Sequence, residues 1–414
     1  MSTIRISGSL KGDILAMPSK SVTHRAIICA ALSQGKSRIS NVELSNDIKA
    51  TINCIEKLGL AAFEYIDSTL YVSSEKPDIK ENVLLNCGES GSTLRFMLPL
   101  APLFSRNAEF IGEGRLMSRP IEPLKTALKK NGLNFLNNKV NGELKNGNFD
   151  IAGDISSQFI SGLLFALPLL KGDSIINLTS KLQSKPYVEL TMYVQKKFGV
   201  TSGFIDNDTI KVTGGQKYTP CDMEIEGDYS HAAFFAVAGA IGGGVAISGL
   251  LADSMQGDKE IFDILKRMGA SVEYGNRYIK VNKSVLNGIT IDAGNIPDLV
   301  PVLAVAGAAA NGQTQILNAG RLRIKESDRL SAISTELKKL GADIVETEDG
   351  LTINGGKTLA GSEVFAHNDH RIAMSLAVAC AITKGEILLS GSESVKKSAV
   401  NFWKEFESLG GKIS

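Results

Sequence analysis

The chain has 414 residues, of which 43% are hydrophobic, and a formal net charge of +1 at pH 7. This length suits about two or three domains, and the near-zero charge argues against nucleic acid or an acidic membrane as the main partner, because both require a basic surplus. The five cysteines, Cys29, Cys54, Cys87, Cys221 and Cys380, lack metal-binding spacing, so we expect reduced core residues. No segment resembles a signal peptide or a membrane span, which predicts a cytoplasmic protein.

Along the chain, a helix with almost no polar face and an amphipathic helix alternate, and this pair occurs six times. A helix without a polar face must be buried on all sides. The six apolar segments are "SKSVTHRAIICAALSQG" (19–35), "SGSTLRFMLPLAPLF" (90–104), "SSQFISGLLFALPLLKG" (156–172), "DYSHAAFFAVAGAIGGG" (228–244), "IPDLVPVLAVAGAAANG" (296–312) and "NDHRIAMSLAVACAITKG" (368–385).

Each amphipathic segment ends in a glycine, roughly 70 residues after the previous one. The closing glycines are Gly59, Gly132, Gly199, Gly269, Gly341 and Gly410. Basic residues in the last turn followed by glycine predict a helix that stops in a left-handed cap. The repeating unit is therefore strand, buried helix, strand, surface helix and further strands. Neither a doubly wound sheet nor a β/α barrel buries its helices inside its strands, so we predict outer sheets around central helices.

The buried helices begin with polar residues, and N-capping accounts for their serines and aspartates. It does not account for cations, because a positive charge near a helix start opposes the helix dipole. The cations near these starts are Lys20, Arg25, Arg95, Arg119, Lys325, Arg329 and Arg371. Several arginines together with serines predict a polyanionic small molecule as ligand. Neither a P-loop nor a strand-linked GxGxxG motif is present, so a nucleotide site of those kinds is not supported.

The stretch "GRLRIKESDRL" (320–330) combines three arginines, a lysine, a glutamate and an aspartate. A solvated helix face is the simpler interpretation of such a charge run. However, Lys325, Glu326 and Arg329 lie one and three residues apart, which lets all three reach one site from a helix start. We therefore interpret this stretch as part of an active site.

Nine motifs in this order resemble the 5-enolpyruvylshikimate-3-phosphate (EPSP) synthase family: "PSKSVTHRA", "GESGSTLRFM", "GEGRLMSRPIEPL", "SSQFISGLL", "SKPYVELT", "DYSHAAFF", "IPDLVPVLA", "RIKESDRL" and "NDHRIAMSLA". The resemblance implies an α/β fold, a two-domain inside-out barrel with three repeats per domain. It implies one domain formed by residues 1–13 and 228–414, an inserted domain of residues 14–227, and an active site in the cleft between them.

The resembling family transfers the enolpyruvyl group of phosphoenolpyruvate to the 5-hydroxyl of shikimate 3-phosphate and releases phosphate. The resemblance implies that Asp298 accepts the hydroxyl proton, that Glu326 transfers a proton at the enolpyruvyl carbon, and that Lys20 is also catalytic. It places around shikimate 3-phosphate Lys20, Ser21, Arg25, Ser156, Ser157, Gln158, Ser184, Tyr187, Asp298 and Lys325. It places around phosphoenolpyruvate Lys20, Gly91, Arg119, Gln158, Arg329 and Arg371. We expect a monomer with these two small-molecule partners, no nucleic acid or membrane partner, no cofactor and no metal.

The chain departs from the family pattern at three positions. Glu89 and Arg321 stand where the family often has asparagine, and a gap-free alignment puts Glu393 where some members supply a lysine to phosphoenolpyruvate. Lys396 or Lys397 would substitute only if that loop shifts. The inhibitor glyphosate binds the family's phosphoenolpyruvate site, and Glu89 leaves sensitivity to it open.

Two other functions compete with this interpretation. The enolpyruvyl transferase acting on UDP-N-acetylglucosamine shares the fold, but it has Lys-Asn where this chain has Lys20-Ser21, and it usually carries a loop cysteine that is absent here. A non-catalytic binding protein would also use a repeat scaffold. Such a protein gains nothing from Asp298 and Glu326 among cations. His370 fits a structural hydrogen bond better than catalysis, and no histidine spacing suggests a metal.

Overall fold

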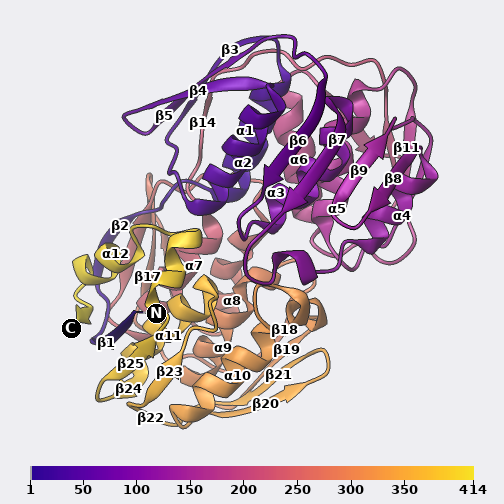
Figure 1. Cartoon of the computed structure of the whole chain (residues 1–414). Helices are drawn as coiled ribbons and strands as arrows, with labels where there is room; N and C mark the ends of the chain where they lie inside the picture. The colour runs from indigo at the N-terminus through magenta and orange to yellow at the C-terminus, as the bar shows by residue number, and fades with distance from the viewer. Residues whose placement is uncertain (1) are drawn as a thin grey trace. The chain divides into compact units, whose positions relative to one another are not determined.

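The structure, a computed structural model, describes residues 2–414 and divides into two compact units (Figure 1). Unit 1 contains Met1–Met17 and Glu226–Ser414, and unit 2 contains Pro18–Ile225. The predicted boundaries, after residues 13 and 227, differ slightly from these. Strand β2 (Gly12–Leu15) pairs along its whole length with β15 (Val245–Ser248) and so belongs to unit 1, whereas the amide of Ile225 donates to the Ser40 carbonyl in unit 2.

Unit 2 consists of three four-stranded sheets around buried helices. Its first repeat contains α1 (Lys20–Leu32), β3 (Gly35–Ser40), α2 (Asn46–Leu58), β4 (Ala61–Ile66), β5 (Thr69–Ser74) and β14 (Met223–Glu224). Its second contains β6 (Lys80–Asn86), α3 (Gly91–Leu100), β7 (Ser105–Ile111), α4 (Glu122–Lys130), β8 (Leu133–Leu136) and β9 (Lys139–Gly142). Its third contains β10 (Asn148–Ile151), α5 (Ser157–Ala166), β11 (Ser174–Leu178), α6 (Lys185–Lys197), β12 (Ser202–Phe204) and β13 (Thr209–Val212).

Unit 1 repeats the same plan three times and adds a two-stranded sheet, β22 (Leu359–Ala360) with β24 (Thr383–Lys384). Its first repeat contains β2, α7 (Tyr229–Ile241), β15, α8 (Ile261–Arg267), β16 (Ser271–Tyr274) and β17 (Tyr278–Asn282). Its second contains β18 (Thr290–Asp292), α9 (Val300–Ala309), β19 (Gln313–Leu317), α10 (Arg329–Lys339), β20 (Asp343–Thr347) and β21 (Gly350–Asn354). Its third contains β23 (Glu363–Phe365), α11 (His370–Ala379), β25 (Ile387–Ser390), α12 (Phe402–Ser408), β26 (Lys412–Ile413) and β1 (Thr3–Ser7).

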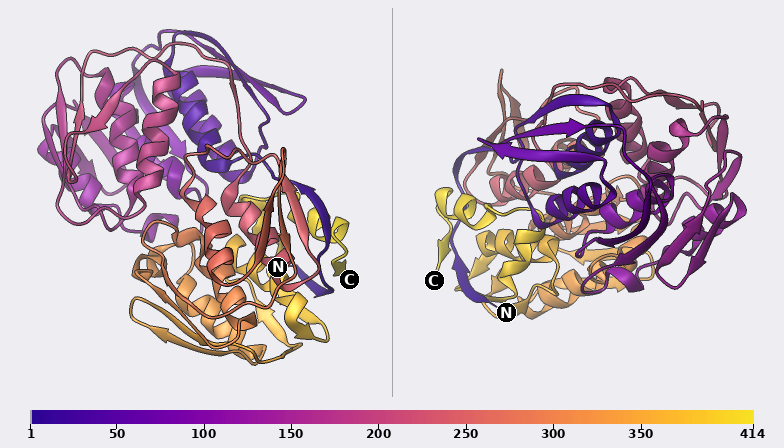
Figure 2. Two further views of the ribbon diagram at one scale, coloured as in Figure 1. Left: turned by 180° about the vertical axis from the view of Figure 1, so that it is seen from behind. Right: turned by 45° about the horizontal axis from the view of Figure 1, so that its top comes forward.

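The six four-stranded sheets of the described chain have the same pairing: one parallel pair at an edge, then two antiparallel pairs. Three of the strands come from outside their own repeat's stretch of chain. Strand β1 completes the last repeat of unit 1, so both chain ends lie side by side in that unit (Figure 2). Strand β2 precedes α1 in the chain but pairs in unit 1, and β14 precedes α7 but pairs in unit 2. The parallel edge strand of each unit's first repeat therefore lies just before the chain passes to the other unit.

Helices lie inside each unit and sheets lie outside, as Figures 1 and 2 show. Every residue of α7 is buried, as its lack of a polar face predicts. All six closing glycines of the surface helices have positive φ; Gly59, for example, caps α2 at φ 70° and donates to the Glu56 carbonyl. The predicted inside-out α/β barrel with six repeats, three in each domain, is confirmed.

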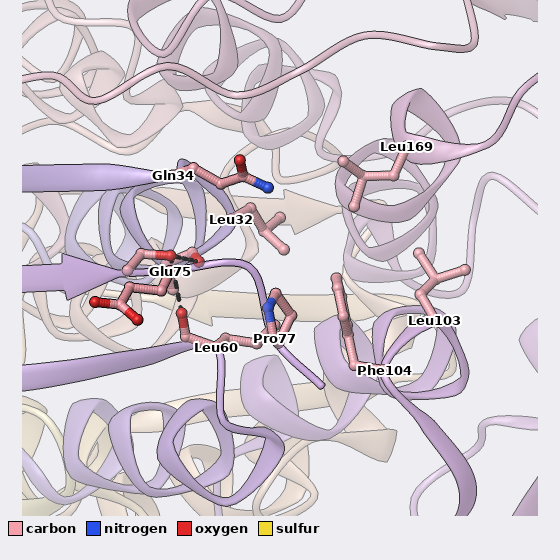
Figure 3. A pocket seen from close by; sticks show the side chains of 10 residues that line it. Leu32, Gln34, Leu60, Glu75, Pro77, Leu103, Phe104 and Leu169 are labelled. Carbon is pink, nitrogen blue, oxygen red and sulfur yellow. Dashed lines mark hydrogen bonds between the residues drawn. The ribbon is translucent and has the colours of Figure 1, made fainter. Parts of the chain in front are cut away.

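The two ends of the buried helices in unit 2 differ in character. At the N-terminal ends, the Ser19, Ser90 and Ser156 side chains cap α1, α3 and α5 by accepting backbone N–H groups. The opposite ends line a mainly apolar pocket of about 260 Å³ that includes Leu32 and Leu103 (Figure 3). None of the predicted site residues lines that pocket.

Within residues 2–414, the structure contains no helix that is both long enough and apolar enough to span a membrane.

Candidate active site

The predicted site residues of unit 2 gather at the N-terminal ends of its helices and in the loop that carries Arg119. We call this group the basic half-site. It consists of Lys20, Ser21, Arg25, Gly91, Arg95, Arg119, Ser156, Ser157, Gln158, Ser184 and Tyr187. The side-chain contacts described next link these residues into one cluster.

Arg25 connects α1 to α6 and is only 3% exposed. Its Nε donates to Thr191 Oγ1 at 2.8 Å, and its terminal nitrogens donate to the carbonyls of Ser21 at 2.7 Å and Tyr187 at 3.0 Å. All three acceptors are neutral. Burial therefore lowers the pKa of Arg25 to about 10. The guanidinium group thus has hydrogen-bond partners, but none of these partners carries a negative charge.

Ser184 precedes α6 in a backbone conformation that is unusual for a residue other than glycine. Its φ is 55° and its ψ is 38°, and it is 3% exposed. The amide of Tyr187 donates to the Ser184 carbonyl at 3.0 Å, which fixes this turn. Non-glycine residues held in the left-handed region concentrate at functional sites, which agrees with the predicted role of Ser184.

Lys20, the first residue of α1, forms an ion pair with Asp47 in the first turn of α2, at 2.7 Å. The Thr93 hydroxyl of α3 donates to the Asp47 carbonyl at 3.5 Å, which places this pair beside the start of α3. His24, one turn further along α1, has a pKa well below its usual value because it is buried and lies near Lys20 and Arg25. It stays neutral and adds no charge.

Gly91, the first residue of α3, faces two arginines. A Cβ atom built on Gly91 would lie 2.7 Å from Arg119 NH1 and 2.8 Å from Arg95 NH1. Arg95 NH1 also donates to Gln158 Oε1 at 2.7 Å, and Gln158 Nε2 donates to Ser92 Oγ at 2.8 Å. These contacts join the starts of α3 and α5 to the Arg119 loop.

The predicted site residues of unit 1 gather around the starts of α10 and α11 and the 3-10 turn η5 (Pro297–Leu299). We call this group the carboxylate-rich half-site. It consists of Asp298, Lys325, Glu326, Arg329, Asp369, His370 and Arg371. Its Arg329 and Arg371 pair with carboxylates, whereas Arg25 and Arg95 of the basic half-site donate to neutral acceptors.

Asp298 is held by two arginines. Its Oδ1 accepts from Arg329 NH1 at 2.9 Å, and its Oδ2 accepts from Arg371 NH2 at 3.0 Å. Burial alone would raise the pKa of Asp298, but the charges of Arg371, Lys325 and Arg329 outweigh burial and hold the pKa well below its usual range. Asp298 is therefore ionised, as predicted, and both of its oxygens are occupied.

Arg329 is 3% exposed and is bonded on a second side by Asp369, which is fully buried. Its Nε donates to Asp369 Oδ2 at 2.8 Å, and its NH2 donates to Oδ1 at 3.2 Å. Although burial opposes both charges, Asp369 raises the pKa of Arg329 and Arg329 lowers the pKa of Asp369. Asp369 also accepts the Arg371 amide as the cap of α11. One carboxylate thus positions both arginines.

Glu326 lies 2.9 Å from His370 Nδ1 and 3.7 Å from Arg329 NH2. Ligand atoms of Glu326, Asp369 and His370 lie within 4.8 Å of one another, a grouping that could hold a metal ion. Arg329 already provides the positive charge between these carboxylates, so a cation would have to displace it. The donor set therefore fits an arginine better than a metal, and His370 fits a residue that positions Glu326.

A family model for "EPSP synthase (3-phosphoshikimate 1-carboxyvinyltransferase)" matches residues 4–406. The chain belongs to the EPSP synthase family. It is 46% identical to 3-phosphoshikimate 1-carboxyvinyltransferases of Clostridium novyi (99% of this chain, 97% of the relative) and Clostridium acetobutylicum (98% and 96%). EPSP synthase from Acinetobacter baumannii matches the structure with a TM-score of 0.83 at 26% identity, over 100% of both chains.

With the family known, the three departures can be located in the structure. Glu89 lies against the loop that carries Arg119, because a Cβ atom on Gly114 would overlap its carboxylate. Arg321 donates to the Gly294 carbonyl at 2.7 Å. Glu393 accepts from the amide of Ser2 at 2.9 Å and from its hydroxyl at 2.7 Å, so it faces the start of the chain.

Lys397, one of the two lysines considered for this loop, lies near the start of α11. Its Nζ donates to the Asn368 carbonyl at 2.7 Å, one residue before the Asp369 cap, and the side chain is 7% exposed. Lys396, its neighbour, is exposed. Lys397 therefore lies beside the carboxylate-rich half-site, whereas Glu393 contacts Ser2.

Three further residues of the site were not identified from sequence: Asp47, Asp258 and Asp369. Asp258 accepts a hydrogen bond from Ser230 at the start of α7, and burial, then Asp298, raise its pKa to about 7. Only Asp369 had a local signal, since it is the capping residue of the "NDHR" motif. Asp47 and Asp258 are distant in sequence from the cations that they serve.

Proposed function

We propose that the protein transfers the enolpyruvyl group of phosphoenolpyruvate to the 5-hydroxyl of shikimate 3-phosphate, releasing phosphate and forming 5-enolpyruvylshikimate 3-phosphate. The observation that carries this proposal is the ionised Asp298 held between Arg329 and Arg371 in a member of the EPSP synthase family. A protein that only binds anions has no use for a carboxylate base among its cations.

Shikimate 3-phosphate would bind first at the basic half-site. Arg25 is buried against neutral acceptors, so the phosphate of the substrate would supply its missing counter-charge. The hydroxyls of Ser156, Ser157 and Ser184 offer further donors to the same oxygens. Lys20 would exchange part of its contact with Asp47 for the substrate.

Phosphoenolpyruvate would bind through an exchange of carboxylates at the other half-site. Its carboxylate takes the Arg329 and Arg371 nitrogens that Asp298 occupies in the free protein. Lys397, Arg119 and Gly91 hold its phosphate. Once the arginines turn to the substrate, Asp298 loses its strongest stabilising contacts and becomes a better base. Binding of phosphoenolpyruvate thus makes Asp298 a stronger proton acceptor.

The proton movements follow from these positions. Asp298 takes the proton of the 5-hydroxyl while the oxygen attacks the second carbon of phosphoenolpyruvate. Glu326, oriented by His370 at 2.9 Å, delivers a proton to the methylene carbon of that substrate. Glu326, now deprotonated, takes a proton back from the resulting methyl group while the C–O bond to phosphate breaks, which restores the double bond. The hydroxyl proton on Asp298 passes to the departing phosphate. Lys20 and Arg119 stabilise the departing phosphate.

One reaction that requires groups from both half-sites requires both units around the same substrates. We therefore place the active site in the cleft between the domains, formed as the substrates bind. Small-angle scattering with and without shikimate 3-phosphate tests this directly. An unchanged radius of gyration would argue against such closure.

Phosphate release by the purified protein tests the reaction itself. Phosphoenolpyruvate and shikimate 3-phosphate are supplied together, and each is then omitted in turn. Release that needs both substrates supports the proposal. Release with UDP-N-acetylglucosamine in place of shikimate 3-phosphate would show that the protein has the activity of the related enolpyruvyl transferase. No release with any combination would favour a non-catalytic binding protein.

A further inference from the structure

Arg95 lies inside unit 2 without a carboxylate partner. We propose that Arg95 is a positioning residue that forms, with Arg119, an oxyanion subsite at Gly91 and fixes the orientation of the Gln158 amide. The inference rests on the proposed function, because the oxyanion is assigned to phosphoenolpyruvate. It adds a residue to which the family resemblance assigns no role.

Arg95 is buried in a way that a purely structural arginine is not. It is 4% exposed, and its guanidinium lies 5.5 Å from the centre of the Phe159 ring. NH1 donates to the neutral Gln158 oxygen, Nε has no hydrogen-bond partner, and Arg95 forms no ion pair within residues 2–414. A buried charge without a counter-charge destabilises the folded protein.

A second cation makes this arrangement more costly. The NH1 atoms of Arg95 and Arg119 lie 2.8 Å and 2.7 Å from the same point, the Cβ position that Gly91 leaves empty. Burial and the charge of Arg119 both lower the pKa of Arg95. Because glycine has no side chain, both guanidinium groups approach the start of α3 at Gly91, and an oxyanion bound between them would supply the counter-charge that Arg95 lacks.

Arg95 also determines how Gln158 is turned. Arginine has donors only, so Gln158 must present its oxygen to Arg95 and its NH2 group to Ser92. The NH2 group donates one hydrogen to Ser92 and makes no other hydrogen bond within the described chain. Its second hydrogen is thus available to a substrate oxygen. Without Arg95 the Gln158 amide can turn over. In the turned orientation its oxygen, which is an acceptor, would face the substrate oxygen.

Arg95→Met separates this role from a structural one, and Arg329→Met is the matched variant. Both arginines are almost fully buried, but Arg329 is bonded to Asp369 and Asp298. In the free protein, Arg95→Met should raise the unfolding temperature by about 2–6 °C, because an uncompensated charge is removed. Arg329→Met should lower it, because Asp369 is left without its partner. A structural role for Arg95 predicts a lower unfolding temperature for Arg95→Met as well, and that result would overturn the inference.

Ligand binding provides the second readout. Inorganic phosphate, which carries only the phosphate chemistry, and pyruvate, which carries only the carboxylate, are added separately while the unfolding temperature is recorded. Phosphate should stabilise the wild-type protein more than Arg95→Met, because Arg25 remains to bind phosphate in both, and pyruvate should stabilise the two proteins equally. Stabilisation by pyruvate that is lost in Arg95→Met would assign the subsite to the carboxylate of the substrate. Equal stabilisation of wild type and variant by both anions would show that Arg95 does not contribute to the subsite.

Kinetics complete the test. Arg95→Met should raise KM for phosphoenolpyruvate by about 10–100-fold with a smaller change in kcat, and Arg95→Lys should recover phosphate binding but not the low KM. An unchanged KM contradicts the inference. If the wild-type protein releases no phosphate from any substrate pair, the proposed function fails, while the unfolding temperatures still report on Arg95.

Discussion

The two half-sites are built on the same repeat architecture, but Arg25 and Arg95 in one and Arg329 in the other differ in whether a carboxylate pairs with them. In unit 2, Arg25 and Arg95 are buried against neutral acceptors, and their pKa values fall. In unit 1, Arg329 is buried to the same extent against Asp369 and Asp298, and its pKa rises. Arg25 and Arg95 therefore lack a counter-charge, whereas Arg329 has one.

This difference assigns a different binding mode to each half-site. An anion that enters the basic half-site gains an uncompensated cation directly. An anion that enters the carboxylate-rich half-site must first displace Asp298 from its two arginines. The basic half-site thus favours binding to the free protein, and the other half-site favours binding coupled to preparation of the base.

The largest effect is expected from removing the base. Asp298→Asn should lower kcat by about 10²–10⁴-fold, because the amide cannot accept the hydroxyl proton, while shikimate 3-phosphate still binds at the basic half-site. Steady-state kinetics and calorimetric titration measure the two quantities. Asp343→Asn, which removes an exposed partner of Lys357, is the control and should leave kcat unchanged. A modest loss in Asp298→Asn would mean that another group is the base.

The next effect concerns the stability of the compensated pair. Asp369→Asn should lower the free energy of unfolding by about 3–5 kcal/mol, because Arg329 loses its buried counter-charge. Glu386→Gln removes the exposed partner of Arg5, at 3.5 Å, and should cost about 0–1 kcal/mol. Denaturant unfolding compares the two variants. An equal loss of unfolding free energy in the two variants would contradict the comparison, because a buried ion pair would then contribute no more than an exposed one.

A smaller, pH-dependent effect is expected at Asp258. Its pKa of about 7 in the folded protein lies above that of an unfolded aspartate, so its ionisation destabilises the folded state progressively as the pH rises from about 4 to 7. Asp258→Asn should therefore be more stable than the wild type by about 1–3 kcal/mol at pH 8 and nearly equal to it at pH 4. Denaturant unfolding at the two pH values measures this. A gain that does not depend on pH would contradict the assigned ionisation.

At Asp298 and Asp369, the dependence of stability on pH has the opposite sign. Their folded pKa values are lowered, so the stability that they provide is present above about pH 4 and is lost as the pH falls further. Hydrogen exchange followed below pH 4 should show the starts of α10 and α11 losing protection before the start of α1, whose Arg25 does not titrate there. Loss of protection at α1 first would contradict the contrast between the half-sites.

The smallest effect is expected at the C-terminal loop. Lys397→Met should raise KM for phosphoenolpyruvate by about tenfold, as the loss of one charge-assisted hydrogen bond predicts. Lys396→Met is the matched control, since this lysine is exposed, and should leave KM unchanged. Reversed results for the two lysines would show that the loop shifts when the substrate binds.

The repeats could be predicted from sequence because each buried helix lacks a polar face and each surface helix ends in a glycine. The resemblance also predicted the two passages between the domains, but the pairing of β2 with β15 and of β14 with β3 could not be predicted, because a strand's sequence does not specify which strand it joins. The cations were found because they oppose the dipoles of their own helices. Their counter-charges were missed because the Lys20–Asp47 and Arg329–Asp369 pairs form only through tertiary packing.

Calorimetric titration of phosphoenolpyruvate into the protein, with and without bound shikimate 3-phosphate, tests the contrast between the half-sites most directly. The account predicts that shikimate 3-phosphate binds the free protein and that phosphoenolpyruvate binds much more weakly until shikimate 3-phosphate is present. If phosphoenolpyruvate binds the free protein as tightly as it binds the shikimate 3-phosphate complex, the account is contradicted. Displacing Asp298 from Arg329 and Arg371 would then require no free energy.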